Sequence, residues 1–388
     1  MKNRMCRKLL AVALSAFMTA AVSAGCGQGT STAEPENAAE TEERTDGETV
    51  EAKIPSEDAT DSFVRQVTDA EGNVVEVPVD ISRIAVTPIP WSSVIYAIDG
   101  TSERMVCIHP GAIKAYTGSY FETMAPDYAK LDTSCIGTDF SINMEEMVNK
   151  GIQAVVIWDY QTDEAEQLKE LGIVPVMLKN ETVEELQASF LAIGQLLGKE
   201  ERAQQFIDLY GEVYEQILSY GDQVASAEKP KVLYLRNKDL KLQGNDNFVK
   251  EALELAGADN VAADSSDISM EEILEIDPDM ILLSWFDDFT PEDLYNNTID
   301  GQDWSNVTAV QEKRVYKTPI GIYRWDAPGV ETPLMMMWLA TLIQPEIFSD
   351  IDIRQETADY FRDYFEIDLT EADLDQILSA EMNQDSIQ

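Results

Sequence analysis

The stretch SMEEILEIDPDMILLSW, residues 269–285, has a counterpart in the first half of the chain, NMEEMVNKGIQAVVIW, residues 143–158. Each copy starts with an acidic helix beginning, Met-Glu-Glu, continues as a short helix, and ends in an apolar strand that leads to a tryptophan, Trp158 or Trp285. Chance can produce one such pair of segments. The matching order of their parts nevertheless predicts a pseudo-repeat, with one copy in each of two lobes.

Apolar runs of strand length alternate with helical patterns on either side of both copies. In the first half these runs are RIAVTP (83–88), MVCI (105–108) and VPVML (174–178); in the second half they are KVLYL (231–235) and RVYKTP (314–319). Strands that alternate with helices are typical of a parallel sheet with helices on both faces. Ahead of them, FVRQVTDAEGNVVEVP (63–78) predicts a β-hairpin with its turn at Glu71-Gly72-Asn73.

A long stretch of strong helix formers lies between the two halves. The helical pattern is interrupted near Gly198, and from Lys199 to about Gln223 it predicts one long helix. Its central position indicates a stiff spacer, although a long helix inside a single domain is the alternative. We therefore expect an α/β fold of two Rossmann-like lobes with central sheets, at 62–198 and 228–388, joined by a long α-helix at 199–227.

Residues 1–61 are not expected to belong to the folded body. A basic segment within residues 1–8 is followed by an apolar run, Leu9–Val22, and by small residues before Cys26. This layout is typical of a secretory signal peptide at 1–25, and the run is shorter than the roughly 20 residues that a spanning helix needs. It resembles the bacterial lipobox, in which cleavage leaves a lipidated Cys26, although Ser23 stands where leucine is usual. An ordinary signal peptide with an incidental cysteine is the alternative.

The segment after Cys26 is polar and acidic, with almost no large apolar residues up to about Asp61. Such a composition buries too little surface to offset the entropy lost on ordering. We expect residues 26–61 to be a disordered acidic tether. The predicted location is thus extracytoplasmic, with the protein anchored to the cell membrane by the lipidated Cys26.

The chain is strongly acidic, with 72 Asp and Glu residues against 28 Lys and Arg and a formal net charge of −44. This balance argues against nucleic acid, whose binding needs a basic face, and against adsorption to anionic lipid. No second hydrophobic stretch is long enough to span a bilayer. We expect the membrane to be contacted through the lipid anchor only.

Cysteine and histidine are scarce in the expected body. Cys107 and Cys135 lie in strand-like runs, which favours buried free thiols, with a disulfide as the alternative. There is no CxxC or Cys/His metal spacing, and His109 is the only histidine, which argues against a clustered free-metal site. No cofactor is expected.

Several of these segments, in this order, resemble the substrate-binding proteins of ABC importers for iron-siderophores, haem and cobalamin. The resemblance runs from about Val64 to Phe348 and rests on VTDAEGNVVEVP with RIAV, NMEEMV…AVVIW, ELAGADNV, SMEEILEIDPDMILLSW, WSNVTAVQEKRVYKTP and PLMMMWLATLIQPEIF. One departure is Gly151-Ile152-Gln153-Ala154, where the family usually has Pro-Asp before the strand. The resemblance implies a ligand cleft between two lobes, a monomeric binding protein, and an ABC permease with its ATPase as partners.

The same resemblance assigns a docking role to one acidic residue in each lobe, Glu145 and Glu271. Two charges far apart on a rigid surface suit recognition of permease arginines, because complementary charges set orientation and association rate. The alternative is that each is a carboxylate in the first turn of a helix, stabilised by the helix dipole. Their neighbours Glu146 and Glu272 are further candidates.

Loops at the carboxyl ends of the parallel strands are expected to line the cleft. Aromatic rings and planar guanidinium groups there suit a bulky anionic chelate. The ligand-binding candidates are Trp91, His109, Tyr116, Trp158, Tyr160, Arg236, Trp285, Tyr323, Arg324 and Trp325. A salt bridge between Arg324 and Asp326 is the alternative use of that arginine. His109 is a further candidate for ligating haem iron or another metal centre, although a hydrogen-bonded loop histidine is the commoner case.

The function expected from these observations is capture of a metal chelate, foremost a ferric siderophore, and its delivery to a permease. Haem, cobalamin or an oxyanion such as molybdate are the alternatives within this class. The chain is not expected to be an enzyme, because it has no GxSxG elbow, HExxH, Walker loop or GxGxxG. A secreted carboxylate-dependent hydrolase is the alternative from another class, since acidic residues are abundant.

Overall fold

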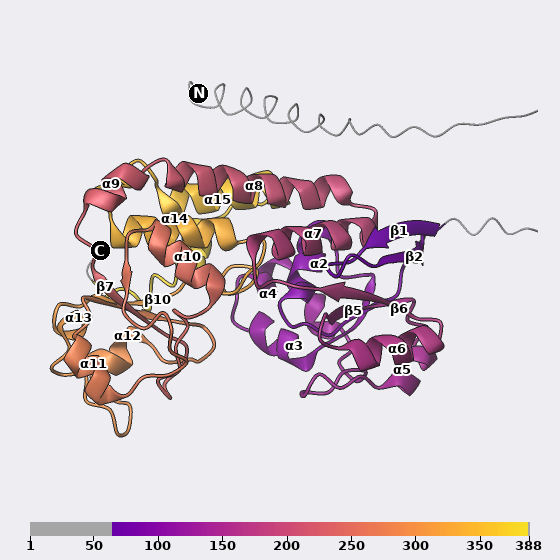
Figure 1. The fold of residues 1–388 in the computed structure, drawn as a ribbon, viewed down its shortest axis with the longest axis horizontal. Coiled ribbons are helices and arrows are strands. Elements are labelled where there is room, and N and C mark those ends of the chain that lie inside the picture. Colours follow the sequence, from indigo (N-terminus) through magenta and orange to yellow (C-terminus); the bar gives the residue numbers. More distant parts are fainter. Residues whose placement is uncertain (1–63, 387–388) are drawn as a thin grey trace, which may run out of the picture. The chain divides into compact units, whose positions relative to one another are not determined.

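Each of two lobes is built on a four-stranded parallel sheet in the computed structural model, which describes residues 64–386 (Figure 1). The first sheet contains β3 (Ile84–Val86), β4 (Met105–Ile108), β5 (Ala154–Trp158) and β6 (Val174–Leu178), in the order β4-β3-β5-β6. The second contains β7 (Lys231–Leu235), β8 (Asp259–Asn260), β9 (Met280–Leu283) and β10 (Val315–Lys317), in the order β10-β9-β7-β8. In both sheets the first strand therefore lies between the second and the third.

The two repeated segments occupy equivalent places in the two sheets. In the first lobe, α5 (Met144–Asn149) leads to β5, and in the second lobe α11 (Met270–Ile276) leads to β9. Each strand is the third of its sheet and pairs with the first, β3 or β7. The pseudo-repeat predicted from the sequence is thus confirmed at the level of topology.

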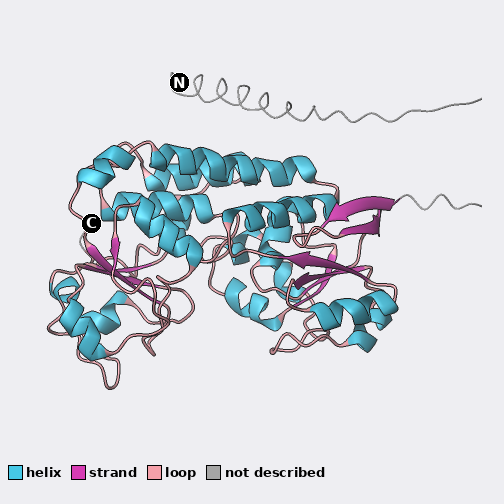
Figure 2. Ribbon diagram, viewed as in Figure 1, coloured by secondary structure: helices cyan, strands magenta, loops and turns pink. Residues whose placement is uncertain are grey.

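Helices cover both faces of each sheet (Figure 2). The first lobe contains α2 (Trp91–Asp99), α3 (Pro110–Tyr116), α4 (Phe121–Met124), the 3-10 helix η1 (Tyr128–Lys130), α6 (Thr162–Glu170) and α7 (Val183–Leu197). The second half contains α10 (Asn247–Leu255), α12 (Pro291–Tyr295), α13 (Thr308–Gln311), α14 (Thr332–Ile343), α15 (Ile353–Phe365) and α16 (Glu371–Ile377). The predicted hairpin is confirmed as the antiparallel pair β1 (Val64–Thr68) and β2 (Val74–Pro78).

The connecting segment forms two helices where the sequence predicted one. Gly198, with a φ of +66°, ends α7, and α8 (Glu200–Leu218) then packs beside α7 at one end and beside α14 further along (Figure 1). The chain breaks at Ser219 and Tyr220 before the short α9 (Gly221–Ser226). The break follows from local chemistry, because the Ser219 hydroxyl donates to the Gln216 carbonyl inside the last turn and competes with helix continuation.

One hydrophobic core is shared by both lobes. Alternate residues of the sheets, such as Val86 in β3 and Val232 in β7, belong to a single buried cluster that also includes Phe206 of α8 and Leu334 of α14. The opposite face of each sheet packs a smaller separate core under α5 and α6 or under α11 to α13. Continuous packing through the junction of two lobes resists large hinge rotation, because close-packed interiors transmit strain.

The C-terminal helices contact the first lobe as well as the second. Tyr120 and Phe361 of α15 form an edge-to-face ring pair, and the Gln376 amide donates to the Gly118 carbonyl. Arg202 of α8 donates to the Ala97 carbonyl of the first lobe at 3.3 Å and to the Tyr364 carbonyl of α15. These contacts add to the fixed spacing of the lobes in this structure.

The predicted signal peptide, Cys26 and the acidic tether lie outside the described residues. Among the described helices, none is both long and apolar enough to cross a membrane. Cys107 and Cys135 are buried free thiols, and the Cys107 sulfur accepts a hydrogen bond from the Cys135 amide at 3.2 Å. No group of three or more metal-ligating side chains is found within residues 64–386.

Candidate ligand-binding site

Two arginines of the second lobe converge on one aromatic ring. Arg236 directly follows β7 and Phe286 follows β9, the strand paired with β7, so both lie at the carboxyl edge between the first and third strands. The guanidinium carbon of Arg236 is 3.2 Å from the Phe286 ring centroid, and that of Arg324 is 3.1 Å from the same centroid. Two groups this close to one centroid must lie on opposite faces of the ring.

Nearby polar and acidic groups offset only part of the repulsion between these two cations. Burial, and then the charge of Arg324, lower the pKa of Arg236 from its ordinary value. Arg236 donates to the Gln243 side-chain oxygen at 3.2 Å, and Gln243 in turn donates to the Asp326 carbonyl at 2.9 Å. The fully buried Asp326 carboxylate is 3.7 Å from Arg324 Nε, so the salt bridge considered from the sequence is present at long range. It offsets part of the positive charge.

Tyr323, the residue before Arg324, contacts a space that first-lobe residues also line. Tyr323 is buried, and its hydroxyl has no hydrogen-bond partner within the described residues. It lines a narrow space of about 160 Å³ that leaves no room for a water molecule. The rest of its lining is Ile322 and, from the first lobe, Ile89, Ser92, Ser93, Ala112, the predicted site residue Tyr116, Phe121 and Tyr128. The lobes therefore meet closely here, and segments that the sequence placed in one cleft do lie together.

Three ligand-binding candidates of the first lobe are buried and make contacts inside the protein. Trp91 is 1% exposed and packs edge-to-face on Phe190, 5.8 Å between centroids. The Tyr116 hydroxyl donates to the Ala125 carbonyl at 3.0 Å. His109 caps α3, because its Nδ1 accepts the Gly111 amide hydrogen at 2.9 Å, and burial lowers its pKa. The geometry gives each of these side chains a structural task.

The remaining aromatic candidates form two different groups. Trp158 and Tyr160 stack at the end of β5, 6.4 Å between centroids, and Tyr160 is 67% exposed. Trp285 donates its indole hydrogen to the Thr318 carbonyl, and Trp325 donates to the Glu331 carboxylate at 3.3 Å. The two second-lobe tryptophans thus support the segment that carries Arg324.

Sequence reasoning missed several residues around the arginines. Ser92 and Tyr128 lie opposite Tyr323, and the Tyr128 hydroxyl donates to Ser92. Lys317 and Glu331 lie fully buried behind the two loops of the second lobe. Lys317 was detectable as a charged residue inside an otherwise buried strand pattern, whereas nothing in the local sequence marks Tyr128.

The two docking candidates are distinguished from their neighbours by their contacts. Glu145 and Glu271 are exposed and make no ion pair or hydrogen bond with other described side chains. By contrast, Glu146 pairs with Lys150 at 3.6 Å, and Glu272 forms a capping box with Ser269.

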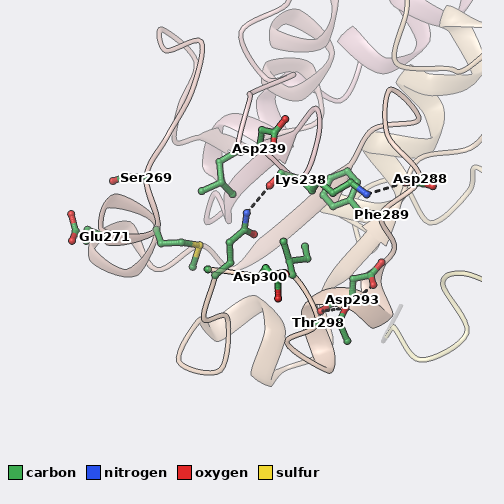
Figure 3. A pocket seen from close by; sticks show the side chains of 14 residues that line it. Lys238, Asp239, Ser269, Glu271, Asp288, Phe289, Asp293, Thr298 and Asp300 are labelled. Carbon is green, nitrogen blue, oxygen red and sulfur yellow. Dashed lines mark hydrogen bonds and ion pairs between the residues drawn. The ribbon is translucent and has the colours of Figure 1, made fainter.

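A larger groove lies on the second lobe (Figure 3). Its volume is about 1020 Å³, and its acidic lining residues are Asp239, Glu271, Asp288, Asp293 and Asp300. Its only basic lining residue, Lys238, pairs with Asp287 at 3.4 Å and Asp288 at 3.2 Å. A groove with this charge repels anions, so it does not compete with the arginine site for an anionic ligand.

Comparison with known proteins shows which family this chain belongs to. A model of the family described as periplasmic binding protein matches residues 119–320. The chain belongs to the periplasmic binding protein family. This periplasmic binding protein is 41% identical to a periplasmic solute binding protein from Veillonella parvula, with a TM-score of 0.79 over 83% of this chain and 99% of that structure.

Two curated relatives of this periplasmic binding protein are named as binding components of transporters or as ligand binders. The molybdate-binding protein MolA of Haemophilus influenzae is 26% identical over 330 residues, 78% of this chain and 91% of MolA. The uncharacterized ABC transporter substrate-binding lipoprotein YvrC of Bacillus subtilis is 24% identical over 227 residues, 55% of this chain and 68% of YvrC. The resemblance to ABC-importer substrate-binding proteins and the two-lobed α/β fold are thus confirmed.

Proposed function

We propose that this protein captures a small oxyanion between its lobes, at Arg236 and Arg324, and delivers it to an ABC importer. The observation that carries the proposal is the convergence of two guanidinium groups on the Phe286 ring, at 3.2 and 3.1 Å. Planar guanidinium groups match the paired oxygens of an oxyanion better than any other side chain.

The charges around this pair favour an anionic ligand. Two like charges held at one ring repel each other, and burial with the charge of Arg324 lowers the pKa of Arg236 although the carboxylates of Asp326 and Asp246 oppose this shift. An anion at the edge of this stack, within reach of N–H groups of both arginines, restores the balance, and the unpartnered Tyr323 hydroxyl supplies one more donor. On the first-lobe side, the hydroxyl groups of Ser92 and Ser93 line the same narrow space.

The closeness of the lobes favours a small ligand over a bulky one. The space that Tyr323 shares with the first lobe has no room even for a water molecule in this structure, so a ligand must part the lobes to enter, and a small oxyanion needs the smaller displacement. The relative MolA is named for molybdate, a tetrahedral oxyanion, and this chain matches 91% of its length.

A ferric siderophore is the second candidate and stays a prediction from the sequence. The observation that favours it is the exposed Trp158–Tyr160 stack, which offers flat apolar area at the end of β5. Haem and cobalamin would use the same surface. A bulky chelate needs the lobes further apart than they stand here.

Docking and location complete the proposal. Glu145 and Glu271 would contact arginines of the permease that works with its ATPase, and each is followed three residues later by an exposed apolar side chain, Val148 or Leu274. Residues three apart lie on one face of a helix, so each lobe offers a charge beside an apolar contact. We infer a monomer outside the cytoplasm, tethered by lipid at Cys26.

A ligand panel tests the function directly. The purified chain is mixed with molybdate, tungstate, sulfate, phosphate, a ferric catecholate chelate, haem or cobalamin, and thermal unfolding and calorimetric binding are measured. A ligand at 100 times its Kd stabilises the native state by about 2.7 kcal/mol. We expect this stabilisation from a tetrahedral oxyanion. Binding of the iron chelate alone would contradict the oxyanion proposal, and turnover of a glycoside would favour a hydrolase.

A further inference from the structure

A buried carboxylate organises the loop that carries Tyr323 and Arg324. Glu331 is 4% exposed, and its Oε1 accepts hydrogen bonds from the Ile322 amide at 3.1 Å and the Trp325 indole at 3.3 Å. Its Oε2 accepts the Tyr323 amide hydrogen at 2.8 Å. Three donors of one short loop are therefore gathered on one side chain.

The close approach of this carboxylate explains the glycine that opens the loop. A Cβ on Gly321 would lie 1.9 Å from Glu331 Oε1, so a larger residue there cannot coexist with the present contacts. The loop and the carboxylate fit each other only in this arrangement, and Arg324 leaves the loop toward Phe286.

A buried ammonium organises the loop that carries Phe286. Lys317 is fully buried, and its Nζ donates to the carbonyl oxygens of Ser284 at 2.9 Å, Asp287 at 2.7 Å and Phe289 at 2.8 Å. All three donor positions of the ammonium group are thus used on one loop. Phe286 lies in the middle of that loop.

Burying a charge is expensive unless it is fully hydrogen-bonded, and apolar residues of similar size often replace buried ions without loss of stability. Here each charge is satisfied mainly by backbone groups of one loop. We propose that Glu331 and Lys317 are positioning residues, which hold the two loops so that Arg324 and Phe286 meet in the ligand-binding geometry. The inference rests on the proposed anion site.

Both Glu331 and Lys317 have pKa values near neutral pH. Burial raises the pKa of Glu331 to about 7 against the opposing effect of its three donors. Burial lowers the pKa of Lys317 to about 8, although the carboxylates of Asp326, Asp287, Asp288 and Asp293 oppose this shift. The titratable group that faces Glu331 from α15 is Tyr360, which burial keeps neutral, with Arg202 beyond it.

Either change of ionisation removes one hydrogen bond from a loop. A protonated Glu331 has one acceptor fewer for the three loop donors, and a neutral Lys317 has two hydrogens for three carbonyl groups. If only the charged forms hold the binding-competent geometry, the apparent affinity falls in proportion to the fraction of molecules in which the group is charged. That fraction is about one tenth at one pH unit below the pKa of Glu331 or one pH unit above the pKa of Lys317. Affinity should therefore be highest between about pH 7 and 8.

Folding stability should change in the opposite direction to affinity. Because the pKa of Glu331 is raised from 4.5 to about 7, its contribution to stability is present below pH 4.5 and is lost as pH rises to about 7. Because the pKa of Lys317 is lowered from 10.5 to about 8, its contribution is present above pH 10.5 and is lost as pH falls to about 8. A merely structural role would not produce an affinity maximum in this range.

The test measures the Kd of the native chain for sodium molybdate from pH 5.5 to 9.5 at constant ionic strength, with unfolding measured in parallel. We expect about sixfold weaker binding at pH 6 and at pH 9 than at pH 7.5. Glu331→Gln should remove the acidic limb and Lys317→Met the alkaline limb, whereas the exposed Glu254→Gln should leave both. An affinity that is flat between pH 6 and 9 would overturn the inference.

A second measurement separates this inference from the proposed ligand. If the native chain binds no molybdate at any pH, the oxyanion proposal fails and the positioning role is decided by hydrogen exchange without ligand. At pH 7.5 the amides of Ile322 and Tyr323 should lose about tenfold of their protection in Glu331→Gln, while amides of α14 keep theirs. Unchanged protection at both amides would refute the positioning role.

Discussion

Arg236 and Arg324 hold their guanidinium groups against opposite faces of one ring, at 3.2 and 3.1 Å from the centroid of Phe286. The first arginine follows the first strand of its sheet, and the second belongs to the loop that follows the fourth. The topology of the second lobe thus assembles a compact cationic centre in a chain whose net charge is −44. Capture of an anion by so acidic a protein depends on this local concentration of positive charge.

Replacing Arg236 by alanine should weaken molybdate binding by about 30-fold or more, which corresponds to a loss of 2 kcal/mol or more for a buried charge contact. Arg236→Lys should restore only part of the affinity, because lysine keeps the charge without the planar fork. Titration calorimetry measures both. Arg362→Ala, which removes a half-buried arginine paired with Asp359 and Asp363, is the matched control. Equal affinities for all variants would show that Arg236 does not contact the ligand.

Replacing Arg324 by alanine should lower stability as well as affinity. It leaves the Asp326 carboxylate buried without its partner, a change that typically destabilises a protein by about 3–5 kcal/mol. Chemical denaturation of Arg324→Ala, compared with the double variant Arg324→Ala with Asp326→Asn, measures this. The double variant should recover most of the stability and none of the affinity. Recovery of neither would mean that the pair is not coupled.

Glu145→Ala and Glu271→Ala should leave ligand affinity unchanged and reduce ligand-driven ATPase activity of the reconstituted transporter. Both carboxylates are exposed and unpaired among the described residues, so their removal disturbs no contact inside the chain. The exposed Glu212 on α8 provides the control substitution, Glu212→Ala. Val148→Ser and Leu274→Ser should weaken the same activity. Full activity of both glutamate variants would exclude these residues from docking.

His109→Ala should destabilise the fold by about 1 kcal/mol without changing affinity, because it removes an N-terminal cap of α3. His109→Asn should restore most of the lost stability, since asparagine is a good capping residue. Denaturant unfolding and calorimetric binding are measured on the same preparations. Loss of affinity in the asparagine variant would instead support the metal-ligand or haem-ligand role that the sequence suggested.

Ligand binding should change the radius of gyration only slightly, by about 1 Å or less, as in pre-organised binding proteins. The reason is the single core that runs from the first-lobe sheet through α8 to α14. X-ray scattering with and without molybdate, with the concentration series extrapolated to zero, measures this. A large contraction on binding would contradict the stiff junction and would make room for a bulky chelate in an open state.

Much of the fold was predictable because its information is local and periodic. The Met-Glu-Glu segments at 143–158 and 269–285 marked equivalent helix–strand units, and the apolar runs gave the strands. The division of the linker into α8 and α9 was missed, because Ser219 and Tyr220 carry no glycine or proline to announce a break. The shared core was also invisible, since it joins residues far apart in the chain.

The site was predictable only in part, because strand ends locate a residue without fixing the direction of its side chain. The rule for carboxyl edges correctly brought Arg236 and Arg324 together. It also selected Trp91 and Tyr116, which the structure places in the core with their rings packed inward. His109 was selected for its chemistry, yet it caps a helix. Tertiary packing decides between these uses.

Anomalous diffraction from a crystal of the native chain grown with molybdate tests the central claim most directly, because molybdenum scatters anomalously and its position needs no interpretation of side-chain density. The account predicts one strong anomalous peak within hydrogen-bonding reach of the Arg236 and Arg324 guanidinium groups and the Tyr323 hydroxyl. A peak in the groove near Asp300, or molybdate that binds in solution yet gives no peak between the lobes, would contradict it.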